Sequence, residues 1–456
     1  MTEPHPPGPI ARAGPADLAM RAISTGGALP MQVAAVLVLG PRREAPGVGG
    51  DDLARVVAER LGGVPRLRQR LLRAPPGAGR PVWVDDPRST APAHVRQAAG
   101  PPPGDEQALL DLATALVAEP LPADRPTWSA LVVPDLPGGR TGVVVVLSHV
   151  LADGIGGLAV LASLVDGGPP CDPSPLRPRP AWHVLAADAW RTRARAVAHW
   201  RAGAAHLRDA VRAARGLRAP RATPCSLLAP TGPHRRAAAV RVPLEPLRLA
   251  AHRAGGTVND ALLVAVAGAL GALLAGRGET VDPVSVTVVV SARRSAGPAD
   301  LGNATTPLVV TVPVAGDPVA RLARFAGTIR AARDTATGPP VIALLGPVFR
   351  VLAAAGGYRL YLRHQRRFHT LVSNLRGPDR PLAVAGRPVE VIVPVAAGEA
   401  GNVTVSFDAL SYAGTLTVTV IADAEHVPDL PVLTTALQEQ LDALVSSPMR
   451  RPAAAP

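Results

Sequence analysis

The 456-residue sequence contains no lysine, so arginine supplies all 48 of its basic side chains. We attribute this bias, with the abundance of alanine and proline, to a GC-rich bacterial genome rather than to selection for arginine chemistry. Aromatic residues make up only 3% of the chain, which predicts an aliphatic core of Ala, Val and Leu. With 47% hydrophobic residues, the chain is long enough to bury a large core in about two domains.

Cysteine and long apolar runs are also scarce. The only two cysteines, Cys171 and Cys225, do not have the spacing of metal ligands, so we expect no resident metal and no disulfide framework. The N-terminus has no apolar core of the signal-peptide type, and no uninterrupted stretch of about 18 apolar residues occurs. These absences predict a cytoplasmic protein whose contact with a membrane, if it makes one, is peripheral at the inner membrane.

Negative charge is in deficit, since 35 acidic residues against 48 arginines give a formal net charge of +13. An excess of this size favours nucleic acid, an anionic membrane surface or phosphate-bearing substrates. The arginines are spread along the chain with almost no aromatic residues among them to stack on bases, which argues against nucleic acid. An anionic membrane surface and phosphate-bearing substrates both remain as candidate partners for the excess positive charge.

One stretch joins a buried strand to polar chemistry. Residues 143–146 are an unbroken run of valine, which is typical of a strand buried on both faces. Ser148 and His149 follow directly, and Asp153 is placed to cap the apolar helix that begins at Gly154. An imidazole held at the end of a rigid strand is suited to general-base catalysis.

The spacing His-x-x-x-Asp-Gly resembles the His-His-x-x-x-Asp-Gly signature of coenzyme A-dependent acyltransferases and peptide-synthetase condensation domains. More narrowly, the chain resembles the wax ester synthase/diacylglycerol acyltransferase family. Segments similar to that family recur in its order along nearly the whole chain, among them residues 65–71, 124–128, 257–260, 301–303 and 371–378. One position departs from the signature, because Ser148 stands where the family has its first histidine; the second histidine, the base, is His149.

The resemblance implies an α/β fold of two chloramphenicol-acetyltransferase-like lobes, which form a V-shaped pseudo-dimer with a central tunnel. Both halves of the sequence mix strands and helices in comparable amounts, as two similar lobes would. The predicted divisions are a disordered N-terminus at 1–14, an N-terminal lobe at 15–170, a helical basic linker at 171–232 and a C-terminal lobe at 233–456. Nine arginines fall between Arg191 and Arg221 in the linker, which suits either anionic lipid headgroups or a solvated connector.

The resemblance also assigns roles to residues. It implies that His149 and Asp153 form the catalytic motif, with His149 as general base and Asp153 as a carboxylate that pairs with a buried arginine. Arg293 is the predicted partner and Arg294 the second choice. Supporting roles fall to Ser148, Gly154, Asn259, Asp260, Ser373 and Asn374, and Trp128 is placed at the core or the wall of a substrate pocket. For Asn259 and Asp260, capping of a helix is the favoured alternative to catalysis.

The sequence contains no Gly-x-Ser-x-Gly elbow, no phosphate loop and no dinucleotide-binding Gly-x-Gly-x-x-Gly after a strand. The resemblance implies an O-acyltransferase that moves an acyl group from acyl-CoA, a co-substrate rather than a bound cofactor, to a long-chain alcohol or diacylglycerol, with peripheral contact to a membrane or lipid droplet. One alternative is a condensation-type enzyme that forms an ester or amide of a specialised metabolite, with an acyl carrier protein as donor. Another is a non-catalytic lipid-binding homologue, which intact His149, Asp153 and Gly154 disfavour.

Overall fold

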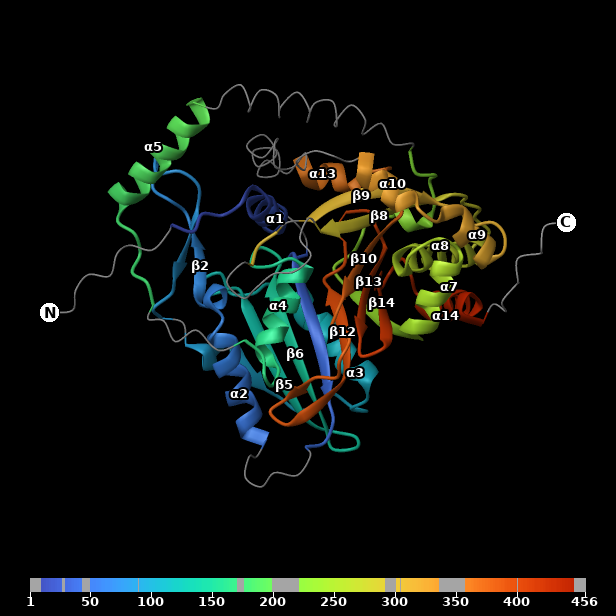
Figure 1. Cartoon of the computed structure of the whole chain (residues 1–456), viewed down its shortest axis with the longest axis horizontal. Coiled ribbons are helices and arrows are strands. Elements are labelled where there is room, and N and C mark those ends of the chain that lie inside the picture. The colour runs from blue at the N-terminus through green and yellow to red at the C-terminus, as the bar shows by residue number, and fades with distance from the viewer. Residues whose placement is uncertain are drawn as a thin grey trace.

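The computed structural model describes residues 10–26, 29–42, 50–88, 90–169, 176–198, 221–291, 301–303, 305–335, 357–399 and 401–446. Two six-stranded sheets lie at the centre of the protein, each covered by helices (Figure 1). This arrangement confirms the predicted two-lobed α/β fold.

The first sheet has the strand order β11-β12-β1-β6-β5-β4. β6 lies in its middle because its side chains are apolar on both faces, and all but the first residue of the strand are buried or nearly so. The strands are β1 (Gln32–Leu39), β4 (Val95–Gln97), β5 (Trp128–Leu136), β6 (Arg140–Ser148), β11 (Ala383–Val384) and β12 (Arg387–Ala396). The helices of this lobe are α1 (Pro15–Gly26), α2 (Gly50–Gly62), α3 (Glu106–Ala118) and α4 (Gly154–Leu164), beside a two-stranded sheet of β2 (Gln69–Leu72) and β3 (Val82–Asp85).

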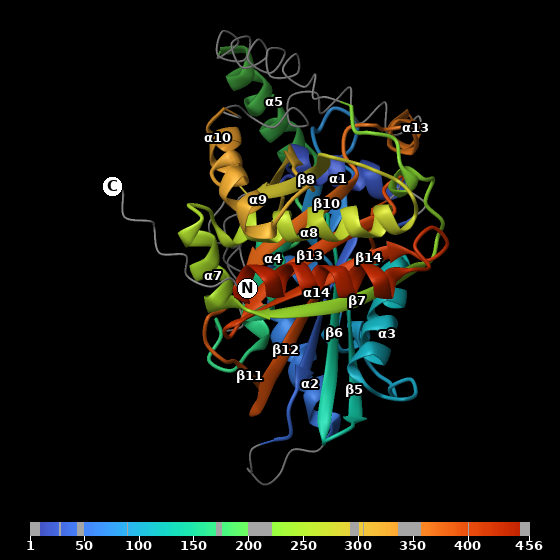
Figure 2. The ribbon, with the colours of Figure 1, turned by 90° about the vertical axis from the view of Figure 1, so that its right-hand side faces the viewer.

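The second sheet has the order β7-β14-β13-β10-β8-β9. Its strands are β7 (Arg235–Pro243), β8 (Val284–Ser291), β9 (Thr305–Val312), β10 (Thr370–Arg376), β13 (Val405–Tyr412) and β14 (Thr415–Asp423). α8 and α14 lie side by side against it (Figure 2). The helices are α7 (Leu244–Arg253), α8 (Val258–Gly276), α9 (Pro318–Phe325), α10 (Thr328–Thr335), α13 (Gly357–Arg363) and α14 (Leu430–Ser446).

α8 is the one helix in the described part of the chain that is long and apolar enough to cross a membrane by length and composition. The most apolar part of α8 is 72% buried inside the protein. Its side chains form the main core of the second lobe with the sheet and α14. α8 is therefore a core helix. It is as apolar as a membrane-spanning helix because it is buried on nearly all sides.

The two lobes are interlocked by the chain. β12 comes from the second half of the sequence but pairs antiparallel with β1, with Val33 opposite Ala396, and so completes the first sheet. In return, α3 of the first lobe contacts β7 of the second, where Gln107 Nε2 donates to the carbonyl of Ala237 at 2.9 Å. The predicted domain boundaries remain a prediction, but two strands from beyond residue 233 belong to the first sheet.

The N-terminal segment is ordered closer to its start than the sequence suggests. Residues 10–14, predicted to be part of a disordered terminus, run beside β3, and Arg12 forms an isolated bridge with Val82. Arg12 Nε also donates to Asp188 Oδ2 at 2.6 Å, on α5 (Trp182–Ala198). The prediction of disorder is wrong for these five residues, because the hydrogen bonds of Arg12 to several acceptors hold the segment in place. The residues before Ile10 lie outside the described part of the chain.

A buried histidine fixes the entry to β10. His369 is fully buried, its Nδ1 accepts from the backbone N–H of Ser285 at 3.0 Å, and its Nε2 donates to the carbonyl of Thr223 at 2.8 Å. A protonated ring has no acceptor nitrogen, so only the neutral form fits this site. Burial accordingly lowers the pKa of His369 below its ordinary value.

This histidine predicts a loss of stability in mild acid. The unfolded chain binds a proton at His369 below about pH 6.5, whereas the lowered pKa makes the folded chain bind it less readily, so the free energy of unfolding falls as the pH drops below about 6.5. His369→Gln, which offers the same acceptor and donor without titrating, should lose less stability over that range. The measurement is the melting temperature of both proteins from pH 5 to 8. The difference between the two curves is the test, because Asp408, whose pKa is raised to about 7, shifts stability in the opposite direction in both proteins. Parallel curves would contradict the prediction.

Candidate active site

His149 lies at the end of β6, in the middle of the first sheet. Ser148 is the last residue of the strand and pairs with Gln32 of β1, and the backbone N–H of His149 continues the ladder by donating to the carbonyl of Met31 at 2.8 Å. The imidazole is half-buried. Its backbone is therefore as rigid as the sheet, while its ring retains access to solvent or substrate.

An asparagine from the second half of the chain holds the imidazole. Nδ1 of His149 lies 2.9 Å from Oδ1 of Asn303, while Nδ2 of Asn303 donates to the carbonyl of His149 at 2.7 Å. Because Nδ2 is the donor in that second bond, Oδ1 must be the acceptor in the first, and Nδ1 carries the proton. Nε2 is then the unprotonated nitrogen, and no hydrogen bond within the described residues engages it.

Asp17 on α1 holds Asn303 in turn. Its Oδ1 accepts from both the backbone N–H and Nδ2 of Asn303, each at 3.1 Å, and its Oδ2 accepts from the backbone N–H of Gly14 at 2.9 Å. Asp17 is 7% exposed, so these bonds replace water around a buried carboxylate. The chain Asp17–Asn303–His149 fixes both the ring orientation and the tautomer, as the third member of a catalytic triad does.

Asp153 forms hydrogen bonds with backbone groups next to the motif. It is completely buried, caps α4 through a bond from the N–H of Gly156 to its Oδ1 at 2.9 Å, and its own N–H donates to the carbonyl of Gly302 at 3.4 Å. The carboxylate thus orders the turn between His149 and the helix, and its backbone contacts the segment that carries Asn303. Arg293 and Arg294, its predicted partners, lie outside the described residues.

Gly154 is where the motif touches the second lobe. A Cβ atom at this position would lie 2.8 Å from both methyl carbons of Leu375 on β10. The absence of a side chain lets β10 approach α4 closely, so the glycine of the motif is explained by packing between the lobes.

Ser148 directly precedes His149 and is 8% exposed. Its hydroxyl accepts from the N–H of Val150 at 3.3 Å, a local turn contact that a histidine would make differently. The substitution therefore changes how the loop is held, and it leaves the Asn303 contact of His149 intact.

Asp260 belongs to a helix cap, and its neighbour Asn259 bonds to β10. Thr257 and Asp260 form a capping box at the start of α8, with Asp260 Oδ2 accepting from the N–H and the hydroxyl of Thr257 at 2.8 Å. Asn259 Oδ1 accepts from Asn374 Nδ2 at 3.2 Å. Capping, the favoured alternative for this pair, thus holds for Asp260, whereas Asn259 and Asn374 bond to each other.

Ser373 lies on the other face of β10, and in the parallel pair of β10 and β13 it is the register partner of Asp408. Both side chains are half-buried. Burial and the negative charge of Glu399 raise the pKa of Asp408 to about 7, although a bond from the N–H of Ala396 opposes the shift. Asp408 thus bridges the second sheet to the end of β12, and sequence analysis did not single it out.

Trp128 is a core residue beneath the site. Its side chain is 2% exposed, its Nε1 donates to the carbonyl of Leu67 at 2.8 Å, and its ring stacks on His94 with the centroids 4.5 Å apart. It is paired with Leu147 on β6 and therefore supports the strand that carries His149. With so little exposed surface, Trp128 offers no wall to a substrate.

Within the described residues, no cluster of three or more His, Cys, Asp or Glu side chains has the arrangement of a metal site. What the structure brings together is His149, Asn303 and Asp17, from three separate stretches of the chain. Sequence analysis found His149, quoted Asn303 only as part of a matching segment, and missed Asp17. An aspartate in the first turn of a helix is an ordinary feature, so nothing local marked it.

Comparison with protein families gives two matches along the chain. Residues 14–262 match the wax ester synthase/diacylglycerol acyltransferase catalytic domain, and residues 301–445 match the C-terminal domain of the same family. A probable diacylglycerol O-acyltransferase of Mycobacterium tuberculosis is 29% identical over 424 residues, which cover 90% of each chain. Another protein of that species, named for the same activity, is 30% identical over 388 residues, covering 78% of this chain and 80% of its own.

Solved structures share the fold. The wax ester synthase/diacylglycerol acyltransferase of Marinobacter aquaeolei superposes with a TM-score of 0.68 at 21% identity, covering 95% of this chain and 98% of that one. The first condensation domain of the calcium-dependent antibiotic synthetase gives a TM-score of 0.60 at 19% identity, with 96% of each chain covered. The two family matches span both lobes, and the chain therefore belongs to the wax ester synthase/diacylglycerol acyltransferase family of acyltransferases.

Proposed function

We propose that the protein transfers an acyl group from acyl-CoA to the hydroxyl of a long-chain alcohol or diacylglycerol, with His149 as the general base. The observation that carries the proposal is the bond from His149 Nδ1 to Asn303, since it leaves the Nε2 lone pair unengaged. A base must present that lone pair to the proton it removes. Relatives named for diacylglycerol acyltransfer support the choice of substrates.

The proposed reaction runs through one proton cycle. Nε2 of His149 takes the proton of the acceptor hydroxyl as the oxygen attacks the thioester carbonyl, so a C–O bond forms. The C–S bond then breaks, and the imidazolium returns the proton to the leaving thiolate, giving the ester and free coenzyme A. Asn303 accepts from Nδ1–H throughout, and the negative charge of Asp17 behind it favours the imidazolium that forms in the transition state.

Ser148 favours keeping a second candidate function. The loop hydroxyl replaces the family's first imidazole and occupies less volume, which changes the packing beside the base. A condensation-type enzyme that uses an acyl carrier thioester and forms an ester or amide on a specialised metabolite requires the same base chemistry. We place the non-catalytic lipid-binding alternative last because the hydrogen bonds around His149 would then have no purpose.

We also propose that the protein is cytoplasmic and contacts a lipid surface through α5. Three apolar side chains of this helix are largely exposed: Trp182 by 67%, Trp190 by 69% and Val197 by 71%. The Arg193 guanidinium lies 6.0 Å from the centroid of Trp190. Exposed tryptophan beside arginine is the composition of helices that lie in a membrane interface, and α5 projects at the edge of the molecule opposite α8 and α14 (Figure 1).

The first prediction tests the reaction itself. The protein, incubated with palmitoyl-CoA and either hexadecanol or diacylglycerol, should release coenzyme A and form ester detectable by mass spectrometry. His149→Ala should lower the rate by roughly 10²–10⁴-fold with the melting temperature retained, because a half-buried imidazole contributes little to the core. His252→Ala, an exposed histidine on α7, is the matched control. A folded His149→Ala protein with wild-type turnover would overturn the assignment.

The second prediction tests the tautomer. Asn303→Ala should lower kcat by roughly 10–100-fold, the range typical of residues that orient a functional histidine, with little change in the KM of either substrate. The reason is that His149 then populates both tautomers and loses its acceptor. The nitrogen chemical shifts of His149 report the tautomer directly. Unchanged shifts in Asn303→Ala would show that Asn303 does not set it, whatever happens to the rate.

The third prediction concerns α5. Trp182→Ala combined with Trp190→Ala should weaken sedimentation with phosphatidylglycerol vesicles several-fold, while turnover of a short-chain, water-soluble substrate pair stays at the wild-type value. Leu249→Ala with Val432→Ala removes exposed apolar surface elsewhere and serves as the control. Equal vesicle binding by the two double variants would contradict a specific role of α5.

A further inference from the structure

An arginine-lined cavity opens at the start of β10, away from His149. Its volume is about 580 Å³, and its walls come from residues 221–228, from α13 and from the turn that leads into β10. Arginine side chains are frequent in the lining, and no carboxylate is among the described residues that form it; the arginines are Arg221, Arg363, Arg366 and Arg367. We call this space the arginine cavity.

Three of these arginines form no ion pair with the described residues. Arg221, Arg363 and Arg366 are exposed, and none of them forms an ion pair with any residue in the described part of the chain. Like charges gathered in one concavity repel each other and raise the local potential. The arrangement is therefore stabilised when an anion enters, above all one with several negative groups.

Hydrogen bonds fix the backbone of the turn that precedes β10. Gln365 is 2% exposed, and its Nε2 donates to the carbonyl of Phe368 at 3.0 Å and to Asn402 Oδ1 at 2.9 Å, while its Oε1 accepts from the N–H of Arg367 at 2.8 Å. Asn402 Nδ2 returns a bond to the carbonyl of Gln365 at 2.8 Å. This network fixes the turn that bears Arg366, since each of its buried amide groups is hydrogen-bonded.

A backbone bond brings the two sides of the cavity together. The N–H of Ala222 donates to the carbonyl of Arg366 at 2.8 Å, which sets Arg221 beside Arg366 although they are far apart in the sequence. His369, locked three residues later, holds the same two segments through its bond to Thr223. The backbone segments that carry Arg221 and Arg366 are thus held side by side before any ligand arrives, which lowers the entropic cost of binding.

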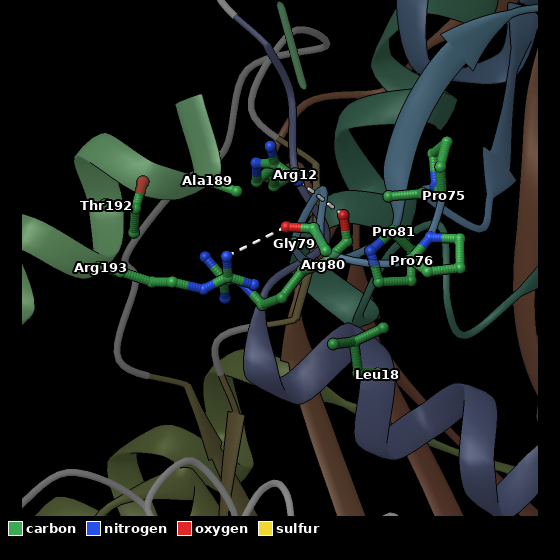
Figure 3. A pocket seen from close by; sticks show the side chains of 12 residues that line it. Arg12, Leu18, Pro75, Pro76, Gly79, Arg80, Pro81, Ala189, Thr192 and Arg193 are labelled. Atoms are coloured by element: carbon green, nitrogen blue, oxygen red, sulfur yellow. Dashed lines mark hydrogen bonds between the residues drawn. The ribbon is translucent and has the colours of Figure 1, made fainter. Parts of the chain in front are cut away.

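A second cavity of similar size provides a contrast. It measures about 570 Å³ and lies between α5 and the loop from Ala74 to Pro81 (Figure 3). Its arginines are already engaged, since Arg12 pairs with Asp188 and Arg193 donates to the carbonyl of Gly77 at 3.0 Å. Of the three arginines in that lining, Arg80 is the one whose side chain has no partner among the described residues. Positive charge lines both cavities, but three arginines without an ion pair to the described residues line the arginine cavity, against one in the second cavity.

The arginine cavity is joined to the active site by a strand. β10 begins at Thr370, next to the arginine-bearing turn, and Leu375 near its other end contacts Gly154 of the catalytic motif. Five residue steps of about 3.3 Å give roughly 16 Å between those two points. A ligand with its anionic end in the cavity and its reactive end near His149 must therefore span a distance of about this length.

We propose that the arginine cavity binds the phosphates of the nucleotide end of the acyl donor, the 3′-phosphate and diphosphate of a coenzyme A thioester, with Arg221, Arg363 and Arg366 as the phosphate ligands. This inference rests on the proposed acyltransfer and assigns its donor subsite. Guanidinium groups bind phosphate oxygens bidentately, and three of them match a ligand with several phosphates better than the single phosphate of a carrier-protein arm. A lipid headgroup phosphate is the other source of the same chemistry, and the experiment separates it.

The kinetic experiment compares two donors with the full-length protein. Arg363→Gln combined with Arg366→Gln should raise the KM for palmitoyl-CoA on the order of tenfold or more, because each lost guanidinium removes charge-assisted bonds to phosphate. The KM for palmitoyl-pantetheine, which has the same thioester but no phosphate, and kcat with both donors should not change. Arg80→Gln, from the second cavity, should match the wild type. An equal rise in KM for both donors, or none for either, would overturn the proposal.

A binding experiment stands apart from catalysis. Adenosine 3′,5′-bisphosphate should bind the wild type in calorimetry and compete with palmitoyl-CoA, and the double variant should lose most of that affinity while Arg80→Gln keeps it. If the double variant instead loses binding to phosphatidylglycerol vesicles and keeps its affinity for the bisphosphate, the cavity serves lipid headgroups and the proposal fails. If no thioester is a donor for the wild type, the proposed function fails, and bisphosphate binding still decides what the cavity holds.

Discussion

The hydrogen bond between Asn303 and His149 is the contact on which the functional arrangement depends. It joins residues 154 positions apart, and it fixes one proton on one ring nitrogen. Such a bond requires both partners to be held within a few tenths of an ångström, since a charge-free N–H···O contact weakens quickly with distance and angle. β6 holds the histidine through its ladder with β1, and Asp17 holds the asparagine from α1. The fold therefore positions a single lone pair by means of three independent elements.

The interlocking of the lobes explains how that accuracy is possible. Two lobes joined by a flexible linker alone would shift relative to each other, as most domain pairs do. Here β12 crosses into the first sheet, α3 contacts β7, and the missing side chain of Gly154 admits Leu375. Each contact removes a separate degree of freedom between the lobes. Two further bonds join the lobes: the backbone N–H of Asp153 donates to the carbonyl of Gly302, and the carboxylate of Asp408 accepts from the N–H of Ala396 at the end of β12.

Features that depend on neighbouring residues could be predicted from the sequence, whereas features that depend on distant residues could not. The strand before His149, the cap at Asp153 and the capping box at Thr257 are local patterns, and each formed as the residues indicated. The roles of Asn303 and Asp17 depend on contacts across 154 and 286 positions, and neither residue differs locally from an ordinary polar one. The order of residues 10–14 was missed for the same reason, because Arg12 finds its carboxylate on α5. Trp128 was predicted at the core or at a pocket wall, and the structure places it in the core, 2% exposed and stacked on His94.

Charge illustrates the difference between composition and placement. The net charge of +13 left anionic membranes and phosphate-bearing substrates equally open, since an arginine-rich composition follows from genome bias as readily as from function. In the folded protein, some arginines form ion pairs with carboxylates of the same chain and others do not. Arg235 is neutralised by Asp423 in a buried pair and Arg277 by Asp429, so neither has charge left for a ligand. Arg221, Arg363 and Arg366 line one cavity and form no ion pair with the described residues, an arrangement that composition alone does not explain. Repulsion among them is unfavourable in the empty protein, and the natural way to offset it is an anion of matching charge and shape.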